Sequence, residues 1–259
     1  MMYTMSDFPA LKEAVLGEGG LWPMIKKDLF QMADMPFYFD TINQPELGTG
    51  LNLSLVIVTM STLETVATLA NINGSIKGRD RNFATDVVEA YGERYFTRVN
   101  PRYLSQKGQS MVRLLWDAYR NGGLHRFLPK KHEFTSNTGK TSTVTFGVTW
   151  LENDLRPNRC CNLNEVKEIQ AKDPTLAGLS LPHLRLTPGV DDSLNFWLCA
   201  QALVLELADS VVEWENELKS GSNFAKWFVD GVNAFEEGLT LAGGSGLAYL
   251  QKLITEVQR

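Results

Sequence analysis

A chain of 259 residues with 44% hydrophobic and 10% aromatic side chains can fill a sizeable core, as one large domain or two small ones, so neither intrinsic disorder nor a disulfide-stapled miniature is expected. A net charge of -5 argues against a surface coated in positive potential for nonspecific binding of nucleic acid. The three cysteines, Cys160, Cys161 and Cys199, fit neither a disulfide framework nor a familiar zinc spacing.

The N-terminal third predicts helices and no membrane span. Pro23 to Met35 predicts a short helix that stops before Pro36, and Gln44 to Leu51 a linker. Leu51 to Ile72 is too rich in polar residues for a transmembrane segment, so a buried helix from Leu51 to Ala70 is predicted instead. No secretory signal precedes it, which predicts a soluble cytoplasmic protein without membrane contact.

The next segments alternate between helices and breaks. Asn71 to Gly78 predicts a turn. Asp80 to Phe96 and Gln106 to Arg120 carry apolar residues at helical intervals and predict amphipathic helices. Gly122 and Gly123 then form a strong helix stop.

The composition changes after this stop. Glu133 to Trp150 is rich in threonine and β-branched residues and is broken at Asn137-Thr138-Gly139, which predicts a β-hairpin. Asn162 to Lys172 predicts a short helix with Asn162 as its cap and Glu165 three residues later, and Leu176 to Pro188 predicts a loop.

The C-terminal part predicts helices again. These are expected at Asp191–Leu218, Asn223–Ala234 and Leu247–Gln258, with the run Gly243-Gly244-Ser245-Gly246 as a linker between the last two. The fold class predicted is mainly α: a helical bundle with a small β-hairpin insertion. Its expected parts are an N-terminal helical extension (1–50), a helical core (51–132), the hairpin (133–160) and C-terminal helices packed on the core (161–259).

The common phosphate-loop, dinucleotide and zinc-protease motifs are absent. One segment remains that suggests a chemical function. It is Arg120-Asn121-Gly122-Gly123-Leu124-His125 at the end of an amphipathic helix, followed by Phe127-Leu128-Pro129-Lys130. Between Arg120 and Lys131 the charged residues are all basic. An ordinary solvated turn would also produce so short a cluster.

This segment resembles the HEPN superfamily, whose motif is an arginine, usually followed by a polar residue, and a histidine a few residues beyond. The resemblance covers roughly Leu51 to Lys131. It implies a helical HEPN-like core, a homodimer whose two motifs share a cleft, and either a metal-independent endoribonuclease of the toxin or defence type or a noncatalytic binding or scaffold protein. A neutralising antitoxin is a further expected partner of such a toxin.

The residue types suit metal-independent RNA cleavage. His125 titrates near neutrality and suits proton transfer, while the planar fork of Arg120 suits the charge on the phosphate. Asn121 is expected to orient His125 or to bind the phosphate, and Arg126, Lys130 and Lys131 to hold the flanking RNA backbone. No metal or cofactor is expected, since the motif contains no cluster of carboxylates.

Two interpretations of these residues stay open. Glu64, in the helix from Leu51 to Ala70, is expected either to orient Arg120 or to lie on an exposed face or at a cap. The motif itself has a purely structural alternative, in which Arg120 interacts with the helix dipole and His125 hydrogen-bonds a loop carbonyl.

Overall fold

A computed structural model gives the fold, and most of its described residues lie in helices. The mainly α fold class with a small sheet is thus confirmed. The structure describes residues 2–42, 51–76, 83–99, 110–121, 132–135, 141–149, 152–153, 156–172, 185–189 and 193–241.

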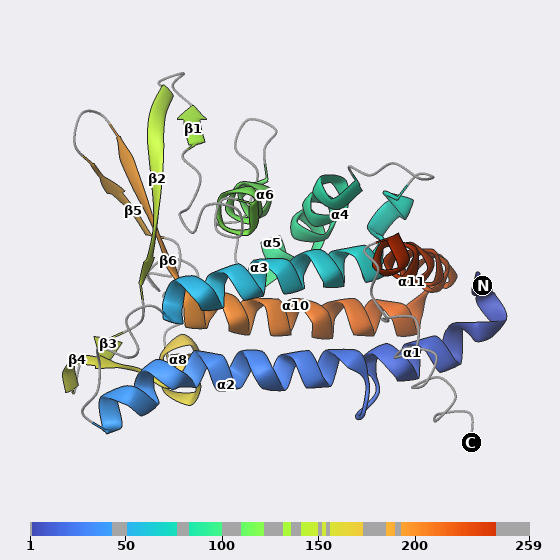
Figure 1. The fold of residues 1–259 in the computed structure, drawn as a ribbon, viewed down its shortest axis with the longest axis horizontal. Helices are drawn as coiled ribbons and strands as arrows, with labels where there is room; N and C mark the ends of the chain where they lie inside the picture. The colour runs from blue at the N-terminus through green and yellow to red at the C-terminus, as the bar shows by residue number, and fades with distance from the viewer. Residues whose placement is uncertain are drawn as a thin grey trace.

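Three long helices lie side by side and form the centre of the molecule (Figure 1). They are α2 (Leu21–Thr41), α3 (Leu51–Ala70) and α10 (Ala200–Ser220). One end is covered by η1 (Met5–Asp7), α1 (Phe8–Leu16) and α11 (Ser222–Leu241). The N-terminal segment is therefore packed into the bundle.

A second group of short helices covers α3 on the side away from α2 (Figure 1). Its members are η3 (Ile72–Gly74), α4 (Phe83–Tyr91), the π-helical turn η4 (Gly92–Phe96), α5 (Thr97–Val99), α6 (Met111–Trp116) and the π-helical turn η6 (Asp117–Asn121). The helices expected over 80–96 and 106–120 are confirmed where these ranges are described, and each one contains a π turn, of which the first leads directly into α5.

Helix α3 is the buried helix that its composition predicts. Its side-chain hydroxyls bond carbonyls one turn back, as Thr59 does to Leu55 at 2.7 Å and Thr68 to Glu64 at 2.8 Å, so these hydroxyl groups are satisfied inside the core. Among the described residues it is the one helix long and apolar enough to span a membrane, and 61% of its most apolar window is buried inside the protein.

Helix α11 approaches the end of α3 very closely. A Cβ atom added at Gly231 would lie 2.4 Å from the backbone oxygens of Thr68 and Leu69. Glycine is therefore required at this crossing, because any side chain would push the two backbones apart.

A four-stranded sheet packs at the other end of the bundle, in the order β1-β2-β6-β5. The hairpin β1 (His132–Thr135) and β2 (Thr141–Thr149) is antiparallel, as predicted. Strand β6 (Leu194–Cys199) pairs in parallel with β2, and β5 (Arg185–Pro188) pairs antiparallel with β6. A separate small sheet joins β3 (Glu152–Asn153) to β4 (Arg156–Cys160).

This sheet corrects two predictions. Residues 194–199 were expected to begin a helix but form β6, since Phe196 and Leu198 turn inward while Asn195 and Trp197 alternate with them. Pairing with β2 outweighs their helical spacing. Residues 185–188 form β5 rather than a loop, so the sheet is not confined to the hairpin region of 133–160.

Helix α2 corrects a third prediction, because it continues through Pro36 to Thr41. Proline inside a helix loses one backbone hydrogen bond and normally ends or kinks the helix. Here Pro36 is buried, and the turn before it is tied to a distant segment, since Asp34 accepts a 2.7 Å bond from the backbone of Leu163. Tertiary packing therefore offsets the local cost.

The helix predicted at 162–172 is confirmed as α8 (Leu163–Lys172). Asn162 Oδ1 accepts from the Glu165 backbone, and the Glu165 carboxylate accepts from the Asn162 backbone, both at 2.9 Å. This reciprocal pair satisfies two backbone donors at the helix start.

Candidate functional site

Ser110 caps the start of the helix that leads to the motif arginine, since its hydroxyl accepts from the backbone of Arg113. The inner face of this helix is apolar, because Val112, Leu115 and Tyr119 are fully buried. The last turn, Asp117–Asn121, widens into a π-helix. π-Helical turns are rare and frequently occur at functional sites.

Arg120 is held by Glu64 of α3. Its Nε lies 2.7 Å from Glu64 Oε2, and its Nη2 donates to Oε1 at 3.3 Å, so the flat edge of the guanidinium meets both carboxylate oxygens. The side chains are 30% and 22% exposed, which places the pair at the boundary between core and solvent. Of the two interpretations of Glu64, the geometry agrees with a partner of Arg120.

Trp116 shares the same carboxylate. Its indole Nε1 donates to Glu64 Oε2 at 3.1 Å, one turn before Arg120 on the helix. Two residues four positions apart on the same helix, Trp116 and Arg120, thus hold the Glu64 carboxylate. Trp116 was not predicted as a site residue from the sequence. An indole N–H one turn before the arginine is nevertheless a signal for such a contact.

Tyr119 fastens this turn to the sheet. Its hydroxyl donates to the carbonyl oxygen of Gly147 on β2 at 2.9 Å, and its ring meets Phe146 edge to face at 5.8 Å. Burial raises the pKa of Tyr119 far above its ordinary value, so the hydroxyl stays protonated and remains a donor. Helix and sheet therefore position Arg120 together.

Of the remaining motif residues, only the backbone of Asn121 is among the described residues. Asn121 closes η6, and its side chain is not among those described. His125, Arg126, Lys130 and Lys131 lie outside the described residues. Whether His125 faces Arg120 stays a prediction.

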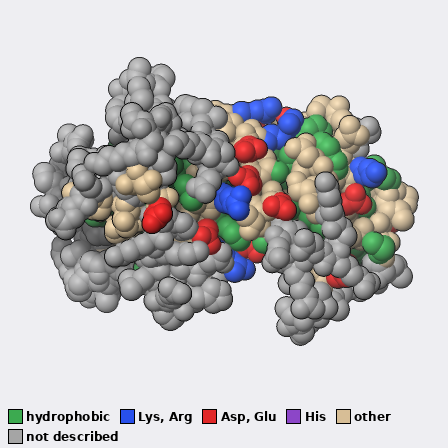
Figure 2. All heavy atoms as spheres, turned by 90° about the horizontal axis from the view of Figure 1, so that it is seen from above, with side chains coloured by type: hydrophobic (Ala, Val, Ile, Leu, Met, Phe, Trp, Pro, Cys, Tyr) green, Lys and Arg blue, Asp and Glu red, His purple; other side chains and the backbone are tan. Residues whose placement is uncertain are grey.

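The surface near the motif mixes charges of both signs. Arg113, on the same helix, pairs with Glu89 of α4 at 2.7 Å. Acidic and basic side chains also lie next to each other in the middle of the face shown in Figure 2. The described part of this face therefore forms no broad basic surface.

A second charged cluster joins η4 to α10 and was missed in the sequence. Glu217 accepts from Arg94 through both oxygens at 2.7 Å, from the Tyr95 hydroxyl at 2.7 Å and from Arg98 at 3.1 Å. The guanidinium of Arg94 also lies over the Phe224 ring at 4.9 Å. The spacing of Arg94 and Arg98 against Glu213 and Glu217, four residues in each case, was the available signal.

Glu217 is partly buried, which by itself opposes ionisation. The hydrogen bonds from Arg94 and Tyr95 and the charge of Arg98 outweigh this effect, so the pKa of Glu217 lies below its ordinary value. The cluster is an ion-paired brace between helices.

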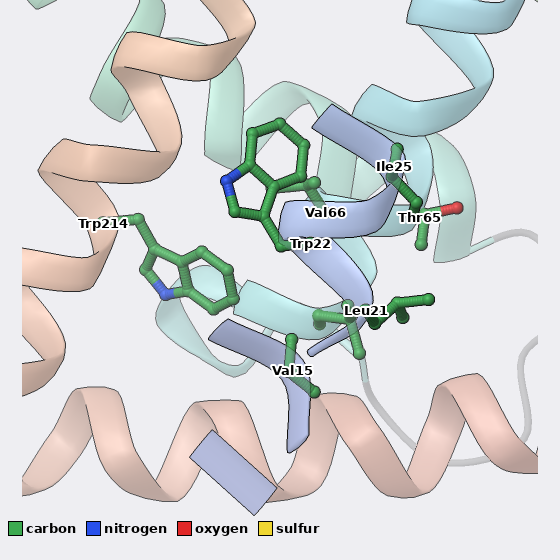
Figure 3. Close-up of a pocket in the computed structure, with 8 residues that line it drawn as sticks. Val15, Leu21, Trp22, Ile25, Thr65, Val66 and Trp214 are labelled. Carbon is green, nitrogen blue, oxygen red and sulfur yellow. The ribbon is translucent and has the colours of Figure 1, made fainter. Parts of the chain in front are cut away.

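Two other features offer no reactive group. A small pocket among α1, α2, α3 and α10 contains side chains without a charge, as Figure 3 shows. It is lined by Val15, Leu21, Trp22, Ile25, Thr65, Val66, Leu69 and Trp214. Cys161 and Cys199 are both buried. No group of acids, histidines or cysteines with the arrangement of a metal site occurs within the described ranges.

Comparison of the chain with models of known families, with curated proteins and with solved structures gives no match. The case for a function therefore depends on the site.

Proposed function

We propose that this chain is a metal-independent endoribonuclease of the HEPN type, with Arg120 and His125 as its reacting pair. The observation that carries the proposal is the contact of Glu64 with both Arg120 and Trp116. An arginine fixed in this way at the end of a helix is prepared to hold a phosphate without losing side-chain entropy at the moment of binding.

The proposed chemistry assigns one role to each residue. His125 takes the proton of the 2′-hydroxyl, which then attacks the adjacent phosphorus, and a second proton donor serves the departing 5′-oxygen. Arg120 stabilises the negative charge that develops at the phosphorus. Asn121 orients His125 or the phosphate, and Arg126, Lys130 and Lys131 hold the flanking strand.

A homodimer completes this chemistry. One motif supplies one histidine, whereas two proton transfers are needed, so two protomers that share a cleft supply both groups. An antitoxin that covers this cleft is the expected neutralising partner.

A second candidate function, a noncatalytic RNA-binding or scaffold protein, has an observation in its favour. The edge of Arg120 that would grip a phosphate is already occupied by Glu64, and the pair together carries no net charge. A phosphate that used this edge would have to displace the carboxylate.

The two functions are separated by incubating the purified chain with mixed RNAs in excess chelator. Cleavage that leaves 2′,3′-cyclic phosphate ends is expected for the ribonuclease. His125→Ala should lower the rate by roughly 10² to 10⁴. Arg120→Lys should also fail, because an ammonium does not reproduce a bidentate fork.

The matched control is Arg113→Lys, on the same helix and also paired with a glutamate. This variant should retain activity. Cleavage that requires magnesium, or that survives His125→Ala within a few fold, would exclude the proposed mechanism. If no RNA is cut under any condition, the binding module becomes the better account.

A further inference from the structure

Trp116 lies at the inner end of a series of contacts that reaches Arg120. The residue is 5% exposed and belongs to the hydrophobic core. Its indole Nε1 donates to Glu64 Oε2 at 3.1 Å, and Glu64 in turn contacts the more exposed Arg120. The three side chains therefore lead from the core toward solvent.

The two contacts on Glu64 Oε2 differ in direction. The N–H of Trp116 points at this oxygen and makes a hydrogen bond. The Nε atom of Arg120 lies closer, at 2.7 Å, but its N–H is not aligned for a hydrogen bond, so this contact is an ion pair. Hydrogen bonds weaken steeply when misaligned, whereas the attraction between charges depends mainly on distance. The indole therefore sets the direction of this carboxylate oxygen.

The indole is also the more rigid of the two donors. A tryptophan side chain has only two rotatable bonds, and that of Trp116 is packed in the core. An arginine side chain has more rotamer freedom, and Arg120 lies partly in solvent. A fixed donor fixes its acceptor, and the fixed carboxylate then limits the positions that are open to the guanidinium.

The carboxylate also spans the π-helical turn. Trp116 is the last residue of α6 and Arg120 lies in η6, and both reach Glu64. A π turn is rarer than an α turn, so contacts with its surroundings have to hold it in place. An acceptor shared by residues on both sides of the turn keeps constant the direction in which Arg120 leaves the helix.

We infer that Trp116 is a positioning residue for Arg120, acting through the Glu64 carboxylate. Its N–H fixes the carboxylate, and the carboxylate holds the guanidinium in the orientation that the phosphate requires. Trp116 itself touches neither the substrate nor the reacting atoms. The role rests on the proposed function, because the orientation of Arg120 affects cleavage only if Arg120 contacts the phosphate.

Trp116→Phe removes the N–H and keeps an aromatic ring in the core. It should lower kcat for RNA cleavage about 10- to 100-fold, the range for a reacting group misplaced by about 1 Å. KM should change by less than about threefold. Trp214→Phe is the matched control, because the indole Nε1 of this buried residue has no hydrogen-bond partner in the described part of the chain. It should leave kcat unchanged.

The same replacement in a Glu64→Ala background separates positioning from general support of the core. A residue that acts through the carboxylate has nothing left to act on in that background. Trp116→Phe should then change kcat by less than about twofold. A residue that only supports the core would lower kcat equally in both backgrounds.

A measurement without RNA serves variants that lack activity. Nitrogen–proton correlation NMR spectra of the full chain report the Nε–H group of Arg120 directly. Its signal should shift, and its exchange with water should become faster, in Trp116→Phe. If this variant folds poorly, Trp116 is replaced by benzothienylalanine, an isostere in which sulfur takes the place of the N–H, and the same change is expected. Trp214→Phe should leave the signal as it is.

Unchanged kcat in a folded Trp116→Phe variant, an equal loss in the Glu64→Ala background, or an Arg120 signal that does not respond would each overturn the inference. Failure of the proposed function appears differently. In that case the wild type cuts no RNA, while the Arg120 signal still responds to both replacements of Trp116.

Discussion

Glu64 and Arg120 are 56 positions apart in the chain and meet edge to edge, with the Arg120 Nε atom 2.7 Å from Glu64 Oε2. Glu64 belongs to α3, the buried helix at the centre of the bundle, and Arg120 to the last turn before the predicted active loop. The ion pair therefore ties the motif to the central helix of the bundle. The same carboxylate also accepts a hydrogen bond from Trp116, so both of these contacts with α3 depend on the side chain of Glu64.

Replacing that group tests its importance. Glu64→Gln keeps the size of the side chain but removes its charge, and we expect a loss of about 1–2 kcal/mol in the free energy of unfolding, since Glu64 contacts both Arg120 and Trp116 but is partly exposed. Urea titration measures this. Any RNA cleavage should fall by a larger factor than stability predicts, because Arg120 loses its fixed position.

Glu89→Gln is the control for this effect, because it breaks the neighbouring pair with Arg113, which is 42% exposed on the arginine side. The loss there should stay below about 1 kcal/mol and leave activity unchanged. Equal effects of the two variants on cleavage would show that Glu64 has no special relation to the motif.

Two glycines of α11 should respond in opposite directions to the same change. Gly231→Ala places a methyl group 2.4 Å from backbone oxygens of α3, and we expect a loss of about 1–3 kcal/mol from overpacking. Gly238→Ala meets nothing within 4 Å, so the higher helix propensity of alanine should stabilise the fold by roughly 0.5–1 kcal/mol. Thermal melting of both variants, measured side by side, checks the close crossing of α11 and α3.

The brace around Glu217 predicts a dependence on pH. Its pKa is lowered in the folded state, so its stabilising effect is present above the ordinary carboxyl value of 4.5 and is lost as the pH falls through the lower folded value. The melting temperature of the wild type should therefore drop below about pH 5 more steeply than that of Glu217→Gln. At neutral pH the variant should be the less stable protein.

Glu215→Gln serves as the comparison, since Glu215 pairs with Lys219 on its own helix, at 3.2 Å. Its acid profile should follow that of the wild type. A Glu217→Gln profile that runs parallel to the wild type would contradict the assigned role of the brace.

The proposed shared cleft predicts a dimer. Light scattering on the purified chain at tens of micromolar should give twice the monomer mass of 29.0 kDa. Mixing His125→Ala and Arg120→Lys chains should restore part of the cleavage if each cleft draws residues from both protomers. A monomer that retains full activity would rule out the shared site.

The elements that the sequence predicts well are those decided by local chemistry. The cap formed by Asn162 and Glu165 and the buried helix from Leu51 to Ala70 are visible in a short window, and the structure has both. The strand at Leu194–Cys199 is not decided locally, because its partner β2 lies some fifty positions earlier. The predicted helix end before Pro36 was wrong for the same reason, because contacts with distant segments keep the helix intact through the proline.

The residues of the candidate site also differ in whether a local pattern predicts them. Arg120 and Glu64 were both identified, since a lone acid in a weakly polar helix and an arginine at a helix end are recognisable patterns. Trp116 was not, because an indole on an amphipathic helix usually indicates core packing. The Glu217 brace was also missed, since its members are over a hundred positions apart and the spacing within each segment does not say which segments meet.

The parallel pairing of β2 with β6 has a consequence for engineering the chain. Strand β6 passes into α10 without an intervening residue, at Cys199 and Ala200, so the sheet is continuous with the bundle. Deleting the hairpin at 132–149 would leave an open edge along residues 194–199, a strand with four large apolar residues. Unpaired edges of this kind recruit strands from other molecules. The hairpin therefore acts as a cover against self-association, and its excision should yield an insoluble product rather than a minimal helical domain.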